Sequence, residues 1–207
     1  MFITYFTITM RSKIILIFLF YWLVLVNGCA KEKINVLPPQ ANDASIEELL
    51  SEAKENHYRD LDLALAYANL ALEKANGEED IAAIHRQIGF FHESHNLVQK
   101  AYQHYELELT YAERSGDTDL IIAAYTDLAI ISRRKANYQA CKEFHLKALK
   151  IAEQLESTKA LETTYHGLGS LYKDIGDYET AVNYYLKTIE LTEKRGDIPN
   201  AINTKQF

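Results

Sequence analysis

The sequence predicts an all-α fold, a solenoid of stacked helical hairpins, from two observations. First, residues recur at a spacing of forty, as when Tyr125, Leu128 and Tyr138 return as Tyr165, Leu168 and Tyr178. Second, each unit contains two segments with a helical apolar period, separated by short breaks. A fixed period with two helices per unit is typical of a helical solenoid, in which each repeat packs against its neighbours.

Four helix pairs are predicted, at residues 45–76, 80–115, 118–155 and 158–195, and a further helix is predicted from Pro199 to Phe207. The chain has only eight glycines and three prolines in 207 residues, which favours helices with few interruptions. Glycines at positions 77, 116 and 196 are expected to end one helix before the next. Within the pairs, Ala136-Asn137 and Gly176-Asp177 mark tighter turns.

The fourth pair resembles the tetratricopeptide repeat. The resemblance rests on Tyr165-x2-Leu168-Gly169-x2-Tyr172, followed by Gly176-Asp177-Tyr178, Ala181 and Tyr185. In that family a large residue, Leu-Gly, a tyrosine, an alanine and an aromatic residue recur at these offsets. The resemblance covers residues 45–207 and implies a right-handed solenoid of about four repeats plus the first helix of a fifth. We therefore expect a repeat domain over residues 44–207 that is incomplete at its C-terminal end.

The N-terminal segment predicts an exported protein. Arg11 and Lys13 precede Ile14–Val26, a stretch without charge, and this is the pattern of a secretory signal. We expect a signal peptide over residues 1–28, with the natural start at Met10, and a tether over residues 29–43. The alternative is an uncleaved signal anchor, in which Phe2–Met10 lengthens the apolar stretch.

The signal ends in Val26-Asn27-Gly28-Cys29, which resembles the bacterial lipobox. This resemblance implies cleavage after Gly28 and acylation of Cys29, and several acyl chains anchor a protein firmly to a membrane. Ala30 stands where an aspartate would favour the inner membrane, so the outer membrane of a bacterial envelope is the expected location.

The charge of the chain makes nucleic acid an unfavourable partner. The net charge is −7, and removing the +2 of residues 1–28 leaves −9 on the remainder. An acidic body repels phosphate backbones. The second cysteine, Cys141, stands where other repeats have alanine, which predicts a small buried thiol.

No constellation of residues predicts catalysis, a cofactor or a metal site. Ser51–Lys54 and Ser170–Lys173 fit the S-x-x-K spacing of penicillin-recognising enzymes, but no S-D-N or K-T-G partner occurs in the sequence. His92 and His95 lack further ligands for zinc at a suitable spacing, and His92 occupies the tyrosine position of the repeat. We therefore expect a binding protein rather than an enzyme.

The family resemblance implies an inner groove lined by the first helix of each pair, where partners bind as peptides. Transferred by repeat position, the groove residues are Arg86, Phe90, Glu93, Thr126, Ile130, Arg133, Arg134, His166, Ser170 and Lys173. Four of these are basic, which predicts pairing with carboxylates of an acidic partner. The alternative is that Arg133-Arg134-Lys135 only ends a helix, where cations suit the helix dipole.

Two functions fit these observations. The first is a membrane-anchored scaffold that binds a protein or peptide partner in the envelope. The second is the sensory repeat region of a longer regulator, with a histidine kinase or helix-turn-helix output, which the gene sequence beyond codon 207 tests. An apolar face at Val182, Tyr185 and Ile189 further predicts self-association through the C-terminal pair, detectable by sedimentation.

The lipobox resemblance generates the first prediction. Cys29→Ser removes the thiol that accepts the diacylglyceryl group, so labelled palmitate should no longer enter the protein and the signal should remain uncleaved. A neighbouring change, Asn27→Ser, keeps the thiol and serves as the control. Equal palmitate incorporation in wild type and Cys29→Ser would contradict the anchor.

Overall fold

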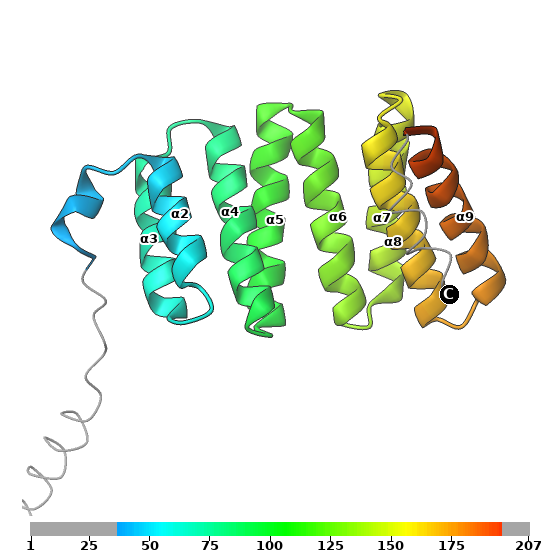
Figure 1. Ribbon diagram of the computed structural model, residues 1–207, viewed down its shortest axis with the longest axis horizontal. Helices are drawn as coiled ribbons and strands as arrows, with labels where there is room; N and C mark the ends of the chain where they lie inside the picture. Colours follow the sequence, from blue (N-terminus) through cyan, green and yellow to red (C-terminus); the bar gives the residue numbers. More distant parts are fainter. Residues whose placement is uncertain (1–36, 196–207) are drawn as a thin grey trace, which may run out of the picture. The chain divides into compact units, whose positions relative to one another are not determined.

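Residues 37–195, which the computed structural model describes, form eight α-helices in four antiparallel pairs and no β-strand. The pairs are α2 (Ile46–Asn56) with α3 (Leu61–Lys74), α4 (Glu78–Ser94) with α5 (Val98–Ser115), α6 (Thr118–Arg134) with α7 (Tyr138–Gln154), and α8 (Thr158–Asp174) with α9 (Tyr178–Arg195). The four pairs follow one another in chain order along the stack (Figure 1). The predicted helical-hairpin solenoid is therefore confirmed.

Some predictions lie outside the described residues: Cys29 with its signal peptide, Gly196, and the helix expected from Pro199. Within residues 37–195, no helix is long and apolar enough to cross a membrane.

The turn inside each of the last three pairs uses one residue in the left-handed region. These residues are Asn96, Ala136 and Gly176, with φ of 58°, 56° and 83°. In each turn the amide N–H of the following residue donates to the carbonyl oxygen five residues earlier. The N···O distance is 2.8 Å for Leu97, 2.9 Å for Asn137 and 3.0 Å for Asp177. This bond satisfies a carbonyl at the helix end, as in a Schellman motif. Both tight turns expected from the sequence are present.

Small residues set the approach of the two helices within a pair. A Cβ added to Gly89 would lie 2.6 Å from the ring of Tyr105, and one added to Gly169 would lie 2.7 Å from that of Tyr185. In the third pair the small position is Ala129, and the ring position carries the smaller His145. Cys141 is fully buried, as expected from its place at a small position.

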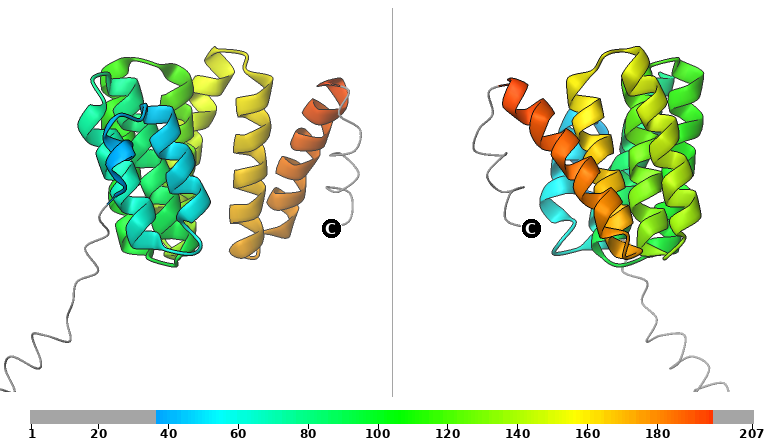
Figure 2. Two further views of the ribbon diagram at one scale, coloured as in Figure 1. Left: turned by 60° about the vertical axis from the view of Figure 1, so that its left-hand side comes forward. Right: turned by 90° about the vertical axis from the view of Figure 1, so that its right-hand side faces the viewer.

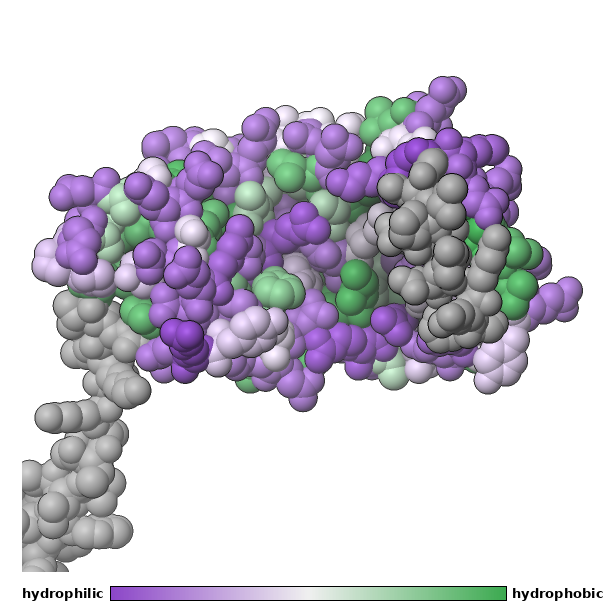
Figure 3. Space-filling model, in the orientation of Figure 1, coloured by the Kyte–Doolittle hydropathy of each residue, from purple (hydrophilic) through white to green (hydrophobic). Residues whose placement is uncertain are grey.

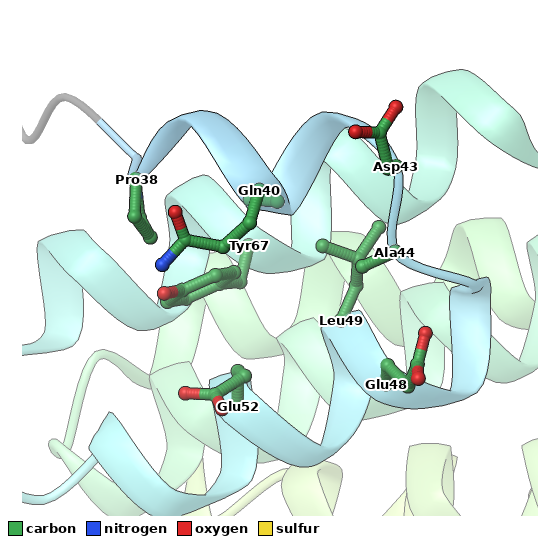
Figure 4. Close-up of a pocket in the computed structure, with 9 residues that line it drawn as sticks. Pro38, Gln40, Asp43, Ala44, Glu48, Leu49, Glu52 and Tyr67 are labelled. Atoms are coloured by element: carbon green, nitrogen blue, oxygen red, sulfur yellow. The ribbon is translucent and has the colours of Figure 1, made fainter.

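The C-terminal part of the predicted tether, residues 37–43, packs against the first helix pair. Residues Pro39–Asn42 form the 3₁₀-helix η1, and Ala41 packs into the core of the first pair with 4% exposure. The Lys74 ammonium holds this turn by donating to the carbonyls of Asn42 at 2.7 Å and Ala44 at 2.6 Å. Figure 4 shows the hollow beside it, where the ring of Tyr67 lies below Pro38 and Gln40. Residues 37–43 of the predicted tether therefore belong to the folded part of the chain, and its residues 29–36 lie outside the described residues.

Two further expectations are corrected. Gly77 does not end α3, because that helix stops at Lys74, and Gly77 instead precedes α4 as its N-cap. The expected apolar face of α9 is also different, because Ile189 is buried and Tyr185 packs against Gly169. The exposed stripe is Tyr178, Val182 and Leu186, at 68%, 51% and 57% exposure. Figure 2 shows α9 inclined to α8 at this end of the stack.

The equivalent turns at residues 136 and 176 generate a stability prediction. Gly176→Ala should destabilise the fold by about 1 kcal/mol, because an L side chain is strained at positive φ. Ala136→Gly should relieve the same strain and stabilise the fold by a similar amount. Both changes in stability are measured as shifts of the urea unfolding midpoint, monitored by circular dichroism. Shifts of the same sign for the two variants would contradict the strained left-handed conformation at these turns.

Candidate functional site

The first helices of the pairs share one surface. Helix α4 contacts α6, and α6 contacts α8, although a second helix separates them in sequence. Two hollows lie on this surface, with volumes of about 560 Å³ and 450 Å³. The larger is lined by Lys54, Ala83, Arg86, Gln87, Phe90, Glu93, Tyr105, Asp127 and Ile130. The smaller is lined by Arg86, Asp119, Leu120, Ile122, Ala123, Thr126, Ser157, Lys159, Ala160 and Thr163. We call the two hollows together the groove.

Three ion pairs join neighbouring first helices, each between residues 41 apart in sequence. They are Arg86 Nε to Asp127 Oδ2 at 2.7 Å, Arg133 Nη1 to Asp174 Oδ2 at 2.7 Å, and Arg134 Nη1 to Glu93 Oε1 at 3.0 Å. This spacing follows from the forty-residue repeat. A separation of one period plus one residue places the two ion-pair partners opposite each other on neighbouring first helices.

These pairs correct the expected basic stretch. Arg86, Arg133 and Arg134 each already pair with an acidic residue of the same protein, so their charges are largely compensated. Lys173 is exposed and has no ion-pair partner among residues 37–195. The groove is therefore nearly neutral instead of strongly basic. It follows that a bound anion would interact with particular atoms rather than with a broad positive field.

The other predicted groove residues divide into three groups. Phe90 and Ile130 line the larger hollow, and Phe90 is 43% exposed. Thr126 is buried, and its hydroxyl donates to the carbonyl of Ile122 at 2.8 Å, so that hydroxyl is occupied.

The remaining two lie on α8 outside both hollows. His166 packs near the Tyr185 ring, with 5.7 Å between ring centroids, and Ser170 Oγ lies 3.3 Å from Tyr185 Oη.

A buried carboxylate lies behind the groove wall. Glu108 on α5 is 1% exposed, and neither of its carboxylate oxygens has a hydrogen-bond partner in the part of the chain described. Its closest cation is Arg86, with 3.7 Å between Glu108 Oε1 and Arg86 Nε. The equivalent positions of the other pairs carry Ala68, Ala148 and Thr188. A glutamate at such a position breaks the pattern of the repeat, and such departures are expected at functional or strained sites.

Burial sets the protonation of this cluster. Burial and, to a lesser extent, the nearby Asp127 raise the pKa of Glu108 to about 9, although Arg86 opposes the shift. Burial also raises the pKa of Asp127, although the Arg86 guanidinium counteracts it. Glu108 is therefore protonated at neutral pH, beside the Arg86–Asp127 ion pair.

Histidines fill part of the second pair. His85 Nδ1 lies 3.2 Å from His104 Nδ1, and the rings of His92 and His104 are 5.3 Å apart. Burial, followed by the charge of His104, lowers the pKa of both His85 and His92 to about 4. These rings are therefore neutral at neutral pH and pack as part of the helix interface.

Sequence reasoning missed Asp127, Glu108 and Tyr105. The hydroxyl of Tyr105 donates to Glu93 Oε2 at 2.7 Å, which positions a carboxylate on the groove wall. Opposite charges 41 residues apart were the signal for Asp127, and a glutamate among alanines at one repeat position was the signal for Glu108.

Comparison with known families and structures supports the fold. A family model described as tetratricopeptide repeat matches residues 120–194. Three similar solved structures are BtubC (BKLC) from P. vanneervenii, aspartyl phosphate phosphatase F from Bacillus subtilis, and a Rap protein in complex with Competence and Sporulation Factor. Their identities are 17%, 14% and 20%, with TM-scores of 0.66, 0.69 and 0.64.

The match covers 76%, 82% and 82% of this chain but only 66%, 45% and 48% of those proteins, in the same order. This chain thus spans about half to two thirds of their length. At such identities the likeness shows the fold alone. Comparison with curated proteins gives no match.

The buried glutamate generates a prediction about pH. The pKa of Glu108 is about 9 in the folded protein and near 4.5 when unfolded, so the folded state holds more protons between these values. Stability should therefore fall as pH rises through this window. Glu108→Gln keeps the neutral shape and should unfold at a higher urea concentration than wild type at pH 8.5.

The histidines act only at the acidic end of this pH window. Their lowered pKa makes the unfolded state bind more protons between pH 6.5 and 4, so they lower stability only below pH 6.5. Between pH 7 and 9 the slope of stability against pH should thus be smaller in Glu108→Gln than in wild type. Identical slopes in the two proteins would show that Glu108 is ionised in the fold.

Proposed function

We propose that this chain, in which residues 120–194 belong to the tetratricopeptide repeat family, is a scaffold that binds a peptide or protein partner in its groove. The observation that carries the proposal is the pair of adjacent hollows on the first helices, which share Arg86 at their boundary. Together they provide an extended surface formed by successive repeats. Solenoid proteins bind their partners on surfaces of this kind.

The groove is held in shape before a partner arrives. Ion pairs fix α4 to α6 and α6 to α8, and Tyr105 fixes the carboxylate of Glu93. Binding to a preorganised surface costs less ordering of side chains, which favours affinity. A Rap protein of similar fold has been solved in complex with Competence and Sporulation Factor, which supports a bound factor for this type of stack.

The proposed setting is the bacterial cell envelope, with Cys29 as the lipid anchor and the outer membrane as the location. The support is the Val26-Asn27-Gly28-Cys29 sequence after an apolar signal. Density fractionation of membranes tests it, and recovery of the full chain with inner membranes would contradict the outer-membrane assignment.

We propose a binding role and no catalytic one. The hydroxyl of Ser170 lies beside the hydroxyl of Tyr185, and Arg86 and Arg133 each pair with an acidic residue of the same protein. The exposed stripe on α9, Tyr178, Val182 and Leu186, supports self-association as a further property of the same scaffold. If the stripe mediates self-association, the double variant Val182→Ser/Leu186→Ser should lose the species larger than the monomer that sedimentation detects in wild type.

Site-specific photocrosslinking tests the groove. Benzoylphenylalanine replaces Phe90 in the larger hollow of the full chain in cells, and in a control it replaces Leu146 on α7, outside both hollows. The two side chains are matched in exposure, at 43% and 42%. We expect discrete protein or peptide adducts from position 90 in clear excess over position 146. Equal adduct yields from the two positions, or none from position 90, would overturn the proposed groove function.

A further inference from the structure

A further hollow lies beside the 3₁₀-helix η1, and it shares no lining residue with either hollow of the groove. Its volume is about 440 Å³, within the range of pockets that hold small ligands. We call it the η1 hollow. It is formed by η1 and its flanks together with α2 and α3 (Figure 4), and its lining residues are Pro38, Gln40, Ala41, Asp43, Ala44, Glu48, Leu49, Glu52 and Tyr67.

The lining of the η1 hollow is acidic. Three of the lining residues are Asp43, Glu48 and Glu52, and no basic residue lines the hollow in the described part of the chain. Neither Asp43 nor Glu52 has an ion-pair partner among residues 37–195. Hydrogen bonds from Ser45 lower the pKa of Glu48, so its carboxylate is ionised at neutral pH. The hollow therefore favours a positively charged ligand.

A buried tyrosine directs an unused hydroxyl into this hollow. Tyr67 is 7% exposed, and its hydroxyl points into the hollow without a hydrogen-bond partner among residues 37–195. Burial, followed by the charge of Glu52, raises the pKa of Tyr67, so the hydroxyl is neutral and its oxygen can accept a hydrogen bond. Polar groups of buried side chains normally have a partner, and the hollow offers room for one.

The wall that η1 contributes is held in place by the first helix pair. Ala41 packs into the core, and the Lys74 ammonium donates to the carbonyls of Asn42 and Ala44. Lys74 does not line the hollow, although its charge contributes to the lowered pKa of Glu48. The hollow is thus formed without a ligand, and binding does not have to order η1, which favours affinity.

The acidic groups surround the hollow and do not converge on one point. Figure 4 shows the Glu52 carboxylate, the Tyr67 hydroxyl and the Gln40 amide toward one end of the hollow. Asp43 and Glu48 lie toward the other end. In agreement with this arrangement, no three acidic, histidine or cysteine side chains in residues 37–195 are placed to hold a metal ion. A ligand that satisfies both ends is therefore an extended cation.

We propose that the η1 hollow binds an aliphatic polyamine, a methylene chain that carries two or more ammonium groups. One ammonium group pairs with Glu52 and donates to the hydroxyl oxygen of Tyr67, and a second pairs with Asp43 at the other end. Hydrogen bonds between ammonium and carboxylate groups are charge-assisted and therefore strong. The methylenes between them lie on the apolar part of the lining, which consists of Pro38, Ala41, Ala44 and Leu49. This site is separate from the groove and does not depend on the function proposed for it.

Calorimetric titration of the full chain in micelles of an uncharged detergent tests the site, with 1,5-diaminopentane as the probe. Pentylamine has the same carbon chain with one ammonium group, and 1,5-pentanediol has the same chain with none. We expect one diamine to bind per chain. Pentylamine should bind at least about fivefold more weakly, because it lacks one charge-assisted pair. The diol should not bind.

Three protein variants locate the ligand. Tyr67→Phe removes only the unpartnered hydroxyl and should weaken diamine binding about fivefold, as loss of one hydrogen bond does. Glu52→Gln should weaken it at least as much. The matched control is Glu55→Gln, which removes the same charge from the same helix but lies outside the hollow. It should change the affinity by less than about twofold, because exposed charges at a distance are screened.

Lys74→Met separates geometry from charge. Loss of a cation near the hollow would strengthen binding of the diamine by charge alone. Loss of the two hydrogen bonds to η1 loosens the wall of the hollow and should weaken binding. We expect weaker binding by Lys74→Met than by wild type, and stronger binding would contradict η1 as the wall of the site.

Several outcomes would overturn the polyamine site. They are absence of diamine binding, equal affinities of wild type, Tyr67→Phe and Glu52→Gln, and equal affinities for the diamine and pentylamine. Tight binding of acetyl-lysine amide would assign the hollow to a lysine of a peptide instead. Diamine binding that occurs only in Lys31→Gln/Lys33→Gln would assign it to lysines of this chain. Urea midpoints of each variant exclude unfolding as the cause of lost affinity, and photocrosslinking from position 90 tests the groove separately.

Discussion

The register between neighbouring first helices is the constraint on which this structure depends. Small residues at Gly89, Ala129 and Gly169 let each first helix approach the ring of its own partner helix, so successive pairs have nearly the same geometry. Because the geometry repeats, residues 41 apart meet across the stack, and three ion pairs form at that separation. The groove, its hollows and the orientation of Arg86 all follow from this register.

The ion pairs across the groove act through geometry more than through stability. The arginine side chains are 33–50% exposed, and pairs at such exposure contribute about 0–1 kcal/mol each. The pairs instead fix which N–H groups of each arginine are used. Both Nη atoms of Arg134 donate to Glu93 and Asn96, whereas Arg86 donates to Asp127 through Nε. The chain thus combines an acidic body with a nearly neutral groove.

Much of the fold could be predicted from the sequence, and less of the site. The helix pairs and tight turns could be predicted because their signals are local in the sequence. These signals are the forty-residue period, the glycine at position 176 and the small residue at position 141. The pairing of the arginines was not, because it depends on which side chains meet across helices that are distant in sequence. The burial of Glu108 was missed for the same reason, and the packing of η1 was missed because four residues are too few to show a helical period.

The docking of η1 limits the length of chain between Cys29 and the folded repeats. Lys74 and Ala41 fix the chain from Leu37 onward, so only eight peptide units separate Cys29 from the folded repeats. At about 3.3–3.6 Å per residue, covalent geometry limits that span to roughly 26–29 Å. A tether extending to residue 43 would have allowed roughly 46–50 Å on the same measure. If Cys29 is acylated, as proposed, this span is the largest distance that can separate the acylated residue from Leu37.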